Sequence, residues 1–221
     1  MTGMIGVISD HAARYTWFNQ CLTALLSETS IRTRGIVYLE WRVGANRGVS
    51  RDSLARECLD QQCDWLFMID DDQVCQPETI MNLLAADHPV VSALILQRGT
   101  PFLPTAYAAH QDGKFSPLDL RSVQPGLVAV AGVGTGALLV KADVFKQLDD
   151  GRPWFLYSED YGEDLYFSNR CKEAGIQMLV DTNCPVGHLI PAAVLPAWLG
   201  NRWGVGIQLA DGTSTSMEMK H

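Results

Sequence analysis

The sequence predicts an α/β protein whose central sheet is mainly parallel and covered by helices on both faces. Short apolar runs rich in β-branched residues alternate with segments in which apolar residues recur every three or four positions. A repeated strand–helix–strand order of this kind joins parallel strands. The 47% hydrophobic and 19% charged content of the 221 residues is that of an ordinary globular chain.

The elements of the first half follow one another regularly. Strands are predicted at 5–9, 35–41, 65–69 and 89–96, and helices between them at 15–28, 50–61 and 77–86. Ser50 is the expected N-cap of the second helix. Pro77 is expected to begin the third, because a first helical residue needs no backbone N–H donor.

The second half of the chain is less regular. Residues 99–127 are rich in Pro, Gly and polar residues, and such a long excursion in a compact domain is typically functional or disordered. Beyond it the patterns predict a strand, a strand followed by a helix, a helix and a last strand, at 127–132, 136–148, 162–175 and 176–181. We expect one domain over residues 1–190, because no convincing linker divides it.

Residues 191–221 are expected to form a C-terminal extension. Its first part, 191–203, is apolar and aromatic, and Asp211-Gly212 predicts a hairpin. A contiguous apolar surface is not expected to stay in solvent. The extension is therefore expected to pack on the same domain, as a lid or as part of the core, or to contact a partner subunit.

Charge and cysteine content limit the class of protein. The net charge of −8 and the pI of about 5.0 argue against a broad surface for nucleic acid or anionic membrane. Six cysteines without a CxxC pair indicate free thiols in a reducing cytosol. The first ten residues do not form a signal peptide, and no run reaches the ~20 apolar residues of a membrane span. We expect a soluble, cytoplasmic protein.

Three consecutive aspartates, Asp70, Asp71 and Asp72, follow the third predicted strand. Ligands of parallel sheets bind beyond the carboxyl ends of the strands. In extended backbone Asp70 and Asp72 would face one side and Asp71 the other, and two converging carboxylates suit a hard cation. An acidic turn leading to the next helix explains the same residues about equally well.

Two further segments carry candidate functional groups. Glu163 and Asp164 lie in the first turn of a predicted helix, where acidic residues also serve simply as caps. His188 follows the last predicted strand. A lone histidine is more often structural, but a neutral imidazole could complete a metal site begun by two carboxylates.

Together these segments resemble the GT-A glycosyltransferases, in particular the family 2-type enzymes, over roughly residues 4–190. The resemblance rests on four segments in the family's order, followed by the histidine: ANRGVSRDSLARECLDQQCDW (45–65), MIDDDQVCQPETI (68–80), GTGALLVKADVF (134–145) and GEDLYFSNRCKEAG (162–175). The second is similar to the DxD strand end and the fourth to the ED-type catalytic helix. Two departures are the acidic middle residue, Asp71, and a second acidic pair, Glu159-Asp160, upstream of the helix. The spacing to Arg170 and Gly175 favours Glu163-Asp164 as the catalytic pair.

The resemblance implies a Rossmann-like GT-A domain that moves a sugar from a nucleoside diphosphate sugar to an acceptor hydroxyl. Asp72 and His188, with Asp70, would bind Mn²⁺ or Mg²⁺, and Asp164 would be the catalytic base of an inverting enzyme, with Glu163 as the next catalytic candidate. The residues expected near the donor are Ser9, Asp10, Glu40, Arg47, Arg51, Asp70, Asp71, Gly134 and Gly136. Surface ion pairing is the alternative for the two arginines, and a plain strand turn for the two glycines.

The expected partners are a UDP-sugar, or alternatively a GDP-sugar, and a hydroxyl acceptor that could be a glycan, a protein or a modified nucleic-acid base. No membrane partner is expected, and a homo-oligomer is possible. Two other functions stay open, a non-catalytic sugar-nucleotide binder and a nucleotidyltransferase. The latter usually has a Gly-rich phosphate loop after the first strand, and SDHAARYT (9–16) is not one.

Overall fold

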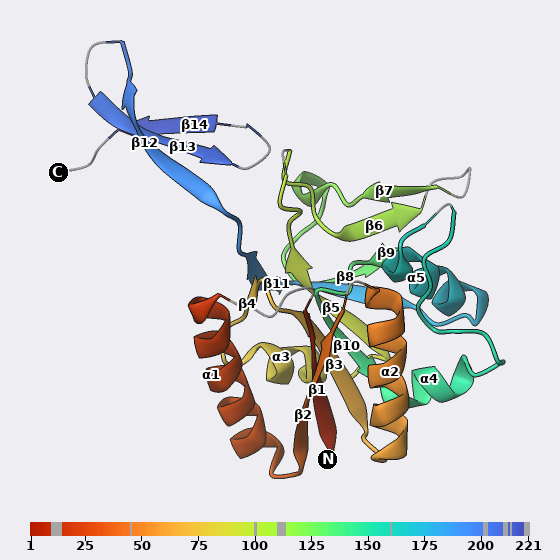
Figure 1. The fold of residues 1–221 in the computed structure, drawn as a ribbon. Helices are drawn as coiled ribbons and strands as arrows, with labels where there is room; N and C mark the ends of the chain where they lie inside the picture. Colours follow the sequence, from red (N-terminus) through yellow and green to blue (C-terminus); the bar gives the residue numbers. More distant parts are fainter. Residues whose placement is uncertain are drawn as a thin grey trace.

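The computed structural model describes residues 1–9, 15–44, 46–99, 101–109, 114–159, 161–200, 203–209, 212 and 214–218. Its centre is a mixed, mostly parallel sheet with the strand order β2-β1-β3-β10-β5-β11-β4, and β8 pairs with β11 (Figure 1). The strands are β1 (Gly3–Ser9), β2 (Val37–Val43), β3 (Trp65–Asp70), β4 (Gln73–Val74), β5 (Val90–Ile95), β8 (Leu127–Val130), β10 (Ala137–Lys141) and β11 (Met178–His188).

The strand directions confirm the predicted sheet and add one feature. Strands β2, β1, β3, β5 and β11 run in one direction. Strand β10 lies antiparallel between β3 and β5, so these two strands are not neighbours. The carboxyl ends of β1, β3 and β11 therefore share one edge of the sheet.

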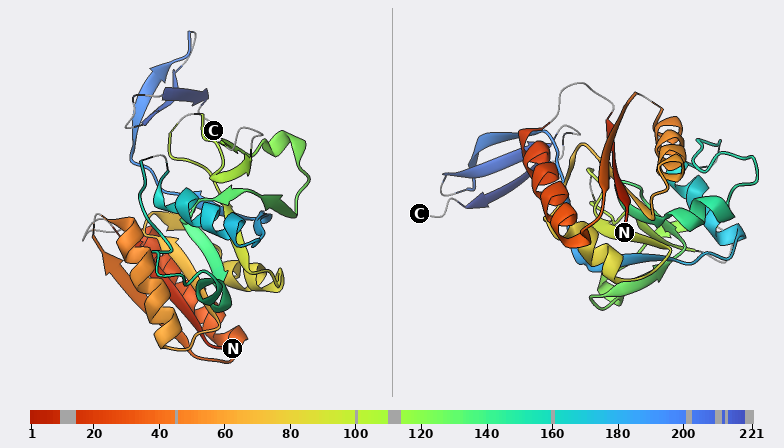
Figure 2. Two further views of the ribbon diagram at one scale, coloured as in Figure 1. Left: turned by 90° about the vertical axis from the view of Figure 1, so that its right-hand side faces the viewer. Right: turned by 90° about the horizontal axis from the view of Figure 1, so that it is seen from below.

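Helices cover both faces of this sheet (Figure 1; Figure 2). One core contains α1 (Thr16–Thr33) and α3 (Thr79–Ala85), and the other contains α2 (Arg47–Asp60), α4 (Ala142–Gln147) and α5 (Glu163–Glu173). Side chains along β3 point alternately to the two faces of the sheet, which explains the two cores. Trp65, Phe67 and Ile69 pack into the first core, and Leu66 and Met68 pack into the second.

Two helix starts differ from the sequence prediction. Helix α2 begins at Arg47, and its N-cap is Asn46, whose side chain accepts a hydrogen bond of 3.1 Å from the Val49 N–H. Ser50 lies inside the helix, so its predicted capping role is wrong. Helix α3 begins at Thr79, two residues after Pro77.

The excursion after β5 forms a second, small sheet with the order β7-β6-β9. Its strands are β6 (Ala106–Ala109), β7 (Phe115–Pro117) and β9 (Gly132–Val133), and a 3-10 turn, η1 (Leu120–Ser122), follows β7. Figure 1 shows this sheet beyond the carboxyl edge of the central sheet, beside α5.

The C-terminal extension forms a third sheet of β12 (Ala192–Trp198), β13 (Trp203–Leu209) and β14 (Ser214–Glu218). Strands β13 and β14 pair antiparallel, as the predicted hairpin requires, although Asp211 is outside the described residues. In both figures this sheet stands away from the rest of the chain. Contact with a partner subunit stays a prediction.

All six cysteines are free thiols. Within the described residues, no helix has both the length and the apolar character needed to cross a membrane.

Candidate active site

Most of the predicted site residues lie at the carboxyl edge of the central sheet. Ser9 ends β1, Asp70 ends β3 and His188 ends β11, while Glu163 begins α5. The two-residue strand β4 follows the aspartates and pairs antiparallel with the end of β11, which sets His188 opposite Gln73. This pairing brings together parts of the chain that are far apart in sequence.

Asp72 and His188 are in direct contact. The Asp72 Oδ2 and His188 Nε2 atoms are 3.4 Å apart. The other ring nitrogen, Nδ1, lies 2.8 Å from the Leu96 carbonyl oxygen, which can only accept, so Nδ1 carries a hydrogen. A backbone acceptor of this kind fixes the orientation of the ring and turns Nε2 toward Asp72.

Two more side chains hold the Asp72 carboxylate. Gln73 donates from Nε2 to Asp72 Oδ1 at 3.0 Å, and Arg98 Nη1 lies 3.0 Å from Oδ2. Burial alone would raise the pKa of Asp72, but the hydrogen bond and charge of His188, with Arg98 and Gln73, hold it below its usual value. Asp72 is therefore an anion with a strong preference for cationic neighbours.

Asp70 and Glu163 are joined by a buried arginine. Arg51, only 1% exposed, places Nη2 2.8 Å from Asp70 Oδ1 and Nε 3.4 Å from Glu163 Oε1. Its Nη1 donates to the Thr135 carbonyl oxygen at 3.2 Å. The surface ion pairing considered for Arg51 is therefore wrong. Its buried guanidinium ties the end of β3 at Asp70 to the start of α5 at Glu163.

The three aspartates have separate partners. The backbone of Asp71 and Asp72 forms a turn between β3 and β4, so the alternation expected for extended backbone stops at Asp70. Asp71 accepts a hydrogen bond from the Ser9 hydroxyl, and its N–H donates to the Ile8 carbonyl at 3.1 Å. Within the described residues, no group of three or more His, Cys, Asp or Glu side chains is placed to hold a metal ion.

Asp164 lies next to this cluster in a partly buried position. It accepts a hydrogen bond of 2.7 Å from the Leu165 N–H. Burial, followed by the charge of Glu163, raises the pKa of Asp164 above its usual value. These two effects outweigh the hydrogen bonds from the backbone and the charge of Arg51.

Two tyrosines next to the acidic pair were not predicted. The Tyr157 hydroxyl hydrogen-bonds to Glu163, and burial together with that carboxylate raises the pKa of Tyr157 to about 12. Burial and the charge of Asp164 raise the pKa of Tyr107, which lies on β6. Neither has a signal in the sequence, because Tyr107 lies in the excursion at 99–127 and Tyr157 lies between the elements predicted at 136–148 and 162–175.

Gln73 and Arg98 were also missed, although each had a weak signal. Gln73 directly follows the three aspartates, and Arg98 follows the carboxyl end of β5. Gln73 is almost completely buried, and its Oε1 has no hydrogen-bond partner among the described residues.

Other predicted donor residues are less closely gathered. Glu40 lies inside β2, three residues before its end at Val43, and pairs with Arg42 at 3.3 Å. Arg47 begins α2, and its charge acts on Tyr157. Asp10, and Asp160 of the alternative acidic pair, lie outside the described residues.

The two predicted glycines have different surroundings. A Cβ atom at Gly134 would lie 2.8 Å from the Thr105 Cβ, so protein packing already explains that glycine. A Cβ atom at Gly136 would lie 3.5 Å from Asp70 Oδ2 and from Gln73 Nε2. Of the two, only Gly136 borders the aspartate turn.

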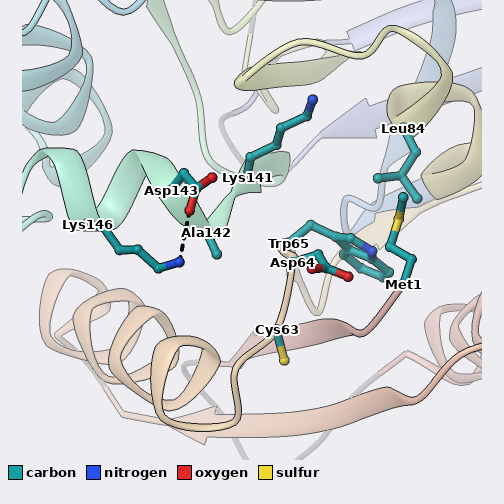
Figure 3. A pocket seen from close by; sticks show the side chains of 9 residues that line it. All are labelled: Met1, Cys63, Asp64, Trp65, Leu84, Lys141, Ala142, Asp143 and Lys146. Carbon is teal, nitrogen blue, oxygen red and sulfur yellow. Dashed lines mark hydrogen bonds and ion pairs between the residues drawn. The ribbon is translucent and has the colours of Figure 1, made fainter.

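A cavity of about 370 Å³ lies at the other end of the sheet, where Trp65 begins β3 and Lys141 ends β10 (Figure 3). Its two lysines, Lys141 and Lys146, already pair with Asp87 and Asp143. Because ligands of such sheets bind at the carboxyl ends of strands, we assign no donor to this cavity.

No family model matches the sequence, and a comparison with curated proteins gives no match. Among solved structures, A197 from STIV is similar over 100% of this chain and 96% of its own, with a TM-score of 0.57 and 15% identity. GalNAc-T7, crystallised with UDP, GalNAc and Mn²⁺, is similar over 85% of this chain, with a TM-score of 0.53 and 14% identity. The chain has a GT-A-like fold.

The matched region is only 43% of the GalNAc-T7 chain. S. aureus TarS 1–349 also matches, over 85% of this chain and 60% of its own, but a TM-score of 0.48 at 11% identity carries no argument. At these identities the similarity shows the GT-A-like fold alone, and the family 2-type resemblance stays a prediction.

Proposed function

We propose that this protein is a metal-dependent glycosyltransferase that moves a sugar from a nucleoside diphosphate sugar to an acceptor hydroxyl. One observation carries the proposal: Asp72 Oδ2 and His188 Nε2 lie 3.4 Å apart at the carboxyl edge of a GT-A-like sheet. Asp70 lies two residues before Asp72, and Arg51 links it to Glu163, which Asp164 follows.

The Asp72–His188 pair fits a divalent cation. Metal–ligand bonds of about 2.0–2.2 Å place two adjacent ligands of one ion roughly 3 Å apart, close to the observed separation. One carboxylate and one imidazole leave most coordination positions open, which suits an ion that also binds phosphate oxygens. The nitrogen ligand favours Mn²⁺ over Mg²⁺.

The protein's own groups have separate tasks in the proposed reaction. Asp72 and His188 would hold the cation, which when bound neutralises charge on the departing diphosphate. Asp70, fixed by Arg51, would orient the ribose or a metal-bound water, with Ser9 and Asp71 beside it. Asp164 would take the proton of the acceptor hydroxyl, and its raised pKa makes it a stronger base than an ordinary aspartate once ionised.

The donor assignment draws on the neighbouring structure. GalNAc-T7 was crystallised with UDP, GalNAc and Mn²⁺, which supports a UDP-sugar for this chain, with a GDP-sugar as the alternative. The acceptor is a glycan, a protein or a modified nucleic-acid base. The six free thiols support a cytosolic location.

Calorimetry with UDP or GDP tests the proposal directly. Nucleotide binding should require Mn²⁺ or Mg²⁺ and should be lost in Asp72→Ala and His188→Ala. Asp143→Ala is the matched control, because Asp143 is exposed and pairs only with Lys146 in the contacts described. The metal site would be refuted if nucleotide bound equally well without a divalent cation and in both site variants.

A second measurement separates an enzyme from a non-catalytic binder. Incubation with isotope-labelled nucleotide sugars and Mn²⁺ should release nucleoside diphosphate, through transfer or slow hydrolysis, and Asp72→Ala should abolish that release. Tight binding without any release would favour the non-catalytic sugar-nucleotide binder.

A further inference from the structure

Asp72 Oδ2 is shared by two cationic or potentially cationic groups. Arg98 Nη1 lies 3.0 Å from this oxygen, and His188 Nε2 lies 3.4 Å from it. The proposed metal would bind through the same oxygen. Two positive groups held against one carboxylate oxygen repel each other, so a cation bound at Oδ2 would weaken the contact of Arg98 with Asp72.

The segment that carries Arg98 is connected to the metal-binding histidine. The Leu96 carbonyl accepts from His188 Nδ1 at 2.8 Å, only two residues before Arg98. The segment then turns back, since the Gln97 N–H donates to the Leu103 carbonyl at 2.8 Å. Its base is therefore fixed against β11, while the Arg98 side chain is 49% exposed and has room to move.

We propose that Arg98 is a counter-ion that Asp72 exchanges for the metal, and that the released guanidinium then binds the donor diphosphate. This inference rests on the proposed function. A metal ion bound to Asp72 would give that carboxylate a net positive neighbourhood, so its attraction for Arg98 would become repulsion. The incoming diphosphate offers new negative charge at the same place, and the planar guanidinium fork matches phosphate oxygens well.

The other site arginine cannot take this role easily. Arg51 is buried and already bonded to Asp70, Glu163 and the Thr135 carbonyl. Moving it would leave Glu163, itself only 6% exposed, without its cation. Arg98 pairs with Asp72 from the solvent side, so leaving Asp72 costs little when a cation replaces it.

The proposal predicts opposite effects of one substitution on two binding steps. In Arg98→Gln, binding of Mn²⁺ alone should become roughly threefold to tenfold tighter, because a competing positive charge is gone. Binding of UDP or GDP in the presence of saturating Mn²⁺ should become roughly tenfold to a hundredfold weaker, because a charge-assisted hydrogen bond is lost. A merely structural role for Arg98 would not move the two affinities in opposite directions.

Two further variants complete the experiment, which uses calorimetry on the full chain. Arg98→Lys keeps the positive charge but not the fork, so Mn²⁺ affinity should stay near wild type while nucleotide affinity falls in part. Arg32→Gln is the matched control. Arg32 is also 49% exposed and paired with an acid, Glu28, but it lies in the last turn of α1, away from the carboxyl edge. It should change neither affinity.

The outcomes separate this inference from the proposed function. If the wild type binds nucleotide with Mn²⁺ but Arg98→Gln shifts both affinities in the same direction, or neither, counter-ion exchange is overturned and the glycosyltransferase proposal stands. If the wild type binds none of UDP, GDP, ADP, CDP and dTDP with Mn²⁺, the proposed function fails and this inference fails with it.

Discussion

Replacing Arg51 with methionine should destabilise the protein strongly. Methionine keeps most of the apolar volume, so the main loss is the charge that faces Asp70 at 2.8 Å and Glu163 at 3.4 Å. Asp70 is partly exposed and can be hydrated, but Glu163 is only 6% exposed. Breaking a buried ion pair from one side costs about 3–5 kcal/mol, because the remaining charge is left without compensation.

Urea denaturation followed by circular dichroism measures this loss of free energy, and thermal unfolding followed by the same signal measures the change in melting temperature. At about 2–4 °C per kcal/mol for a chain of this size, the melting temperature should fall by roughly 6–20 °C. The matched control is Arg56→Met on the same helix. Arg56 is exposed, with its Cζ 5.0 Å from the centre of the Trp154 ring, and its loss should cost about 0.5–1 kcal/mol.

A double substitution identifies the cause. Arg51→Met with Glu163→Gln removes the buried carboxylate that Arg51→Met leaves without its cation, so it should be more stable than Arg51→Met alone. The reasoning fails if Arg51→Met costs no more than Arg56→Met. It also fails if the double variant is less stable than the single one.

Four further predictions concern Asp164 and the C-terminal extension. Asp164→Asn should lower sugar transfer by roughly 10²–10⁴-fold with normal Mn²⁺ and nucleotide binding, and near-normal transfer would make Asp164 a helix cap and Glu163 the next candidate base. Because the pKa of Asp164 is raised on folding, its contribution to stability is lost as pH rises through that pKa, so Asp164→Asn should melt at a higher temperature than wild type at pH 7. For the same reason, wild-type transfer should begin to fall at a higher pH on acidification than for an ordinary aspartate, which a pH profile of kcat/KM measures. Truncation after Ile190 should leave the melting temperature nearly unchanged, because β12–β14 stand apart in Figure 1. Truncation should alter the oligomeric state measured by sedimentation. If both the oligomeric state and the donor affinity were unchanged, the extension would contact neither a partner subunit nor the donor site.

The fold could be predicted from the sequence because its signals are local. Apolar periodicity in segments such as 65–69 depends only on neighbouring residues, and the strand–helix alternation then implies parallel strands. The structure confirms this sheet. The Ser50 cap was wrong because Asn46, just upstream, offers its side chain to the Val49 N–H, and several residues of one segment can satisfy a cap pattern equally well.

The site could be predicted in its residue types but not in its contacts. Asp72 and His188 could be placed at one sheet edge because each follows a predicted strand, and the structure sets Asp72 Oδ2 3.4 Å from His188 Nε2. Their binding of a metal stays a prediction. The direction of the aspartates was misjudged, because Asp71 and Asp72 form a turn into β4, a strand too short for any periodicity to reveal.

By itself, the sequence determined the main strands and helices of the central sheet and which acids and histidine follow them. The tertiary structure alone decided which of these groups are buried and paired. Arg51 is interior because α2 packs over the sheet between β3 and the start of α5, and Arg98 reaches Asp72 because β4 joins β11 beside the end of β5. Burial and ion pairing depend on contacts between segments distant in sequence. Local pattern therefore predicted the elements, whereas the charge balance of the site required the fold.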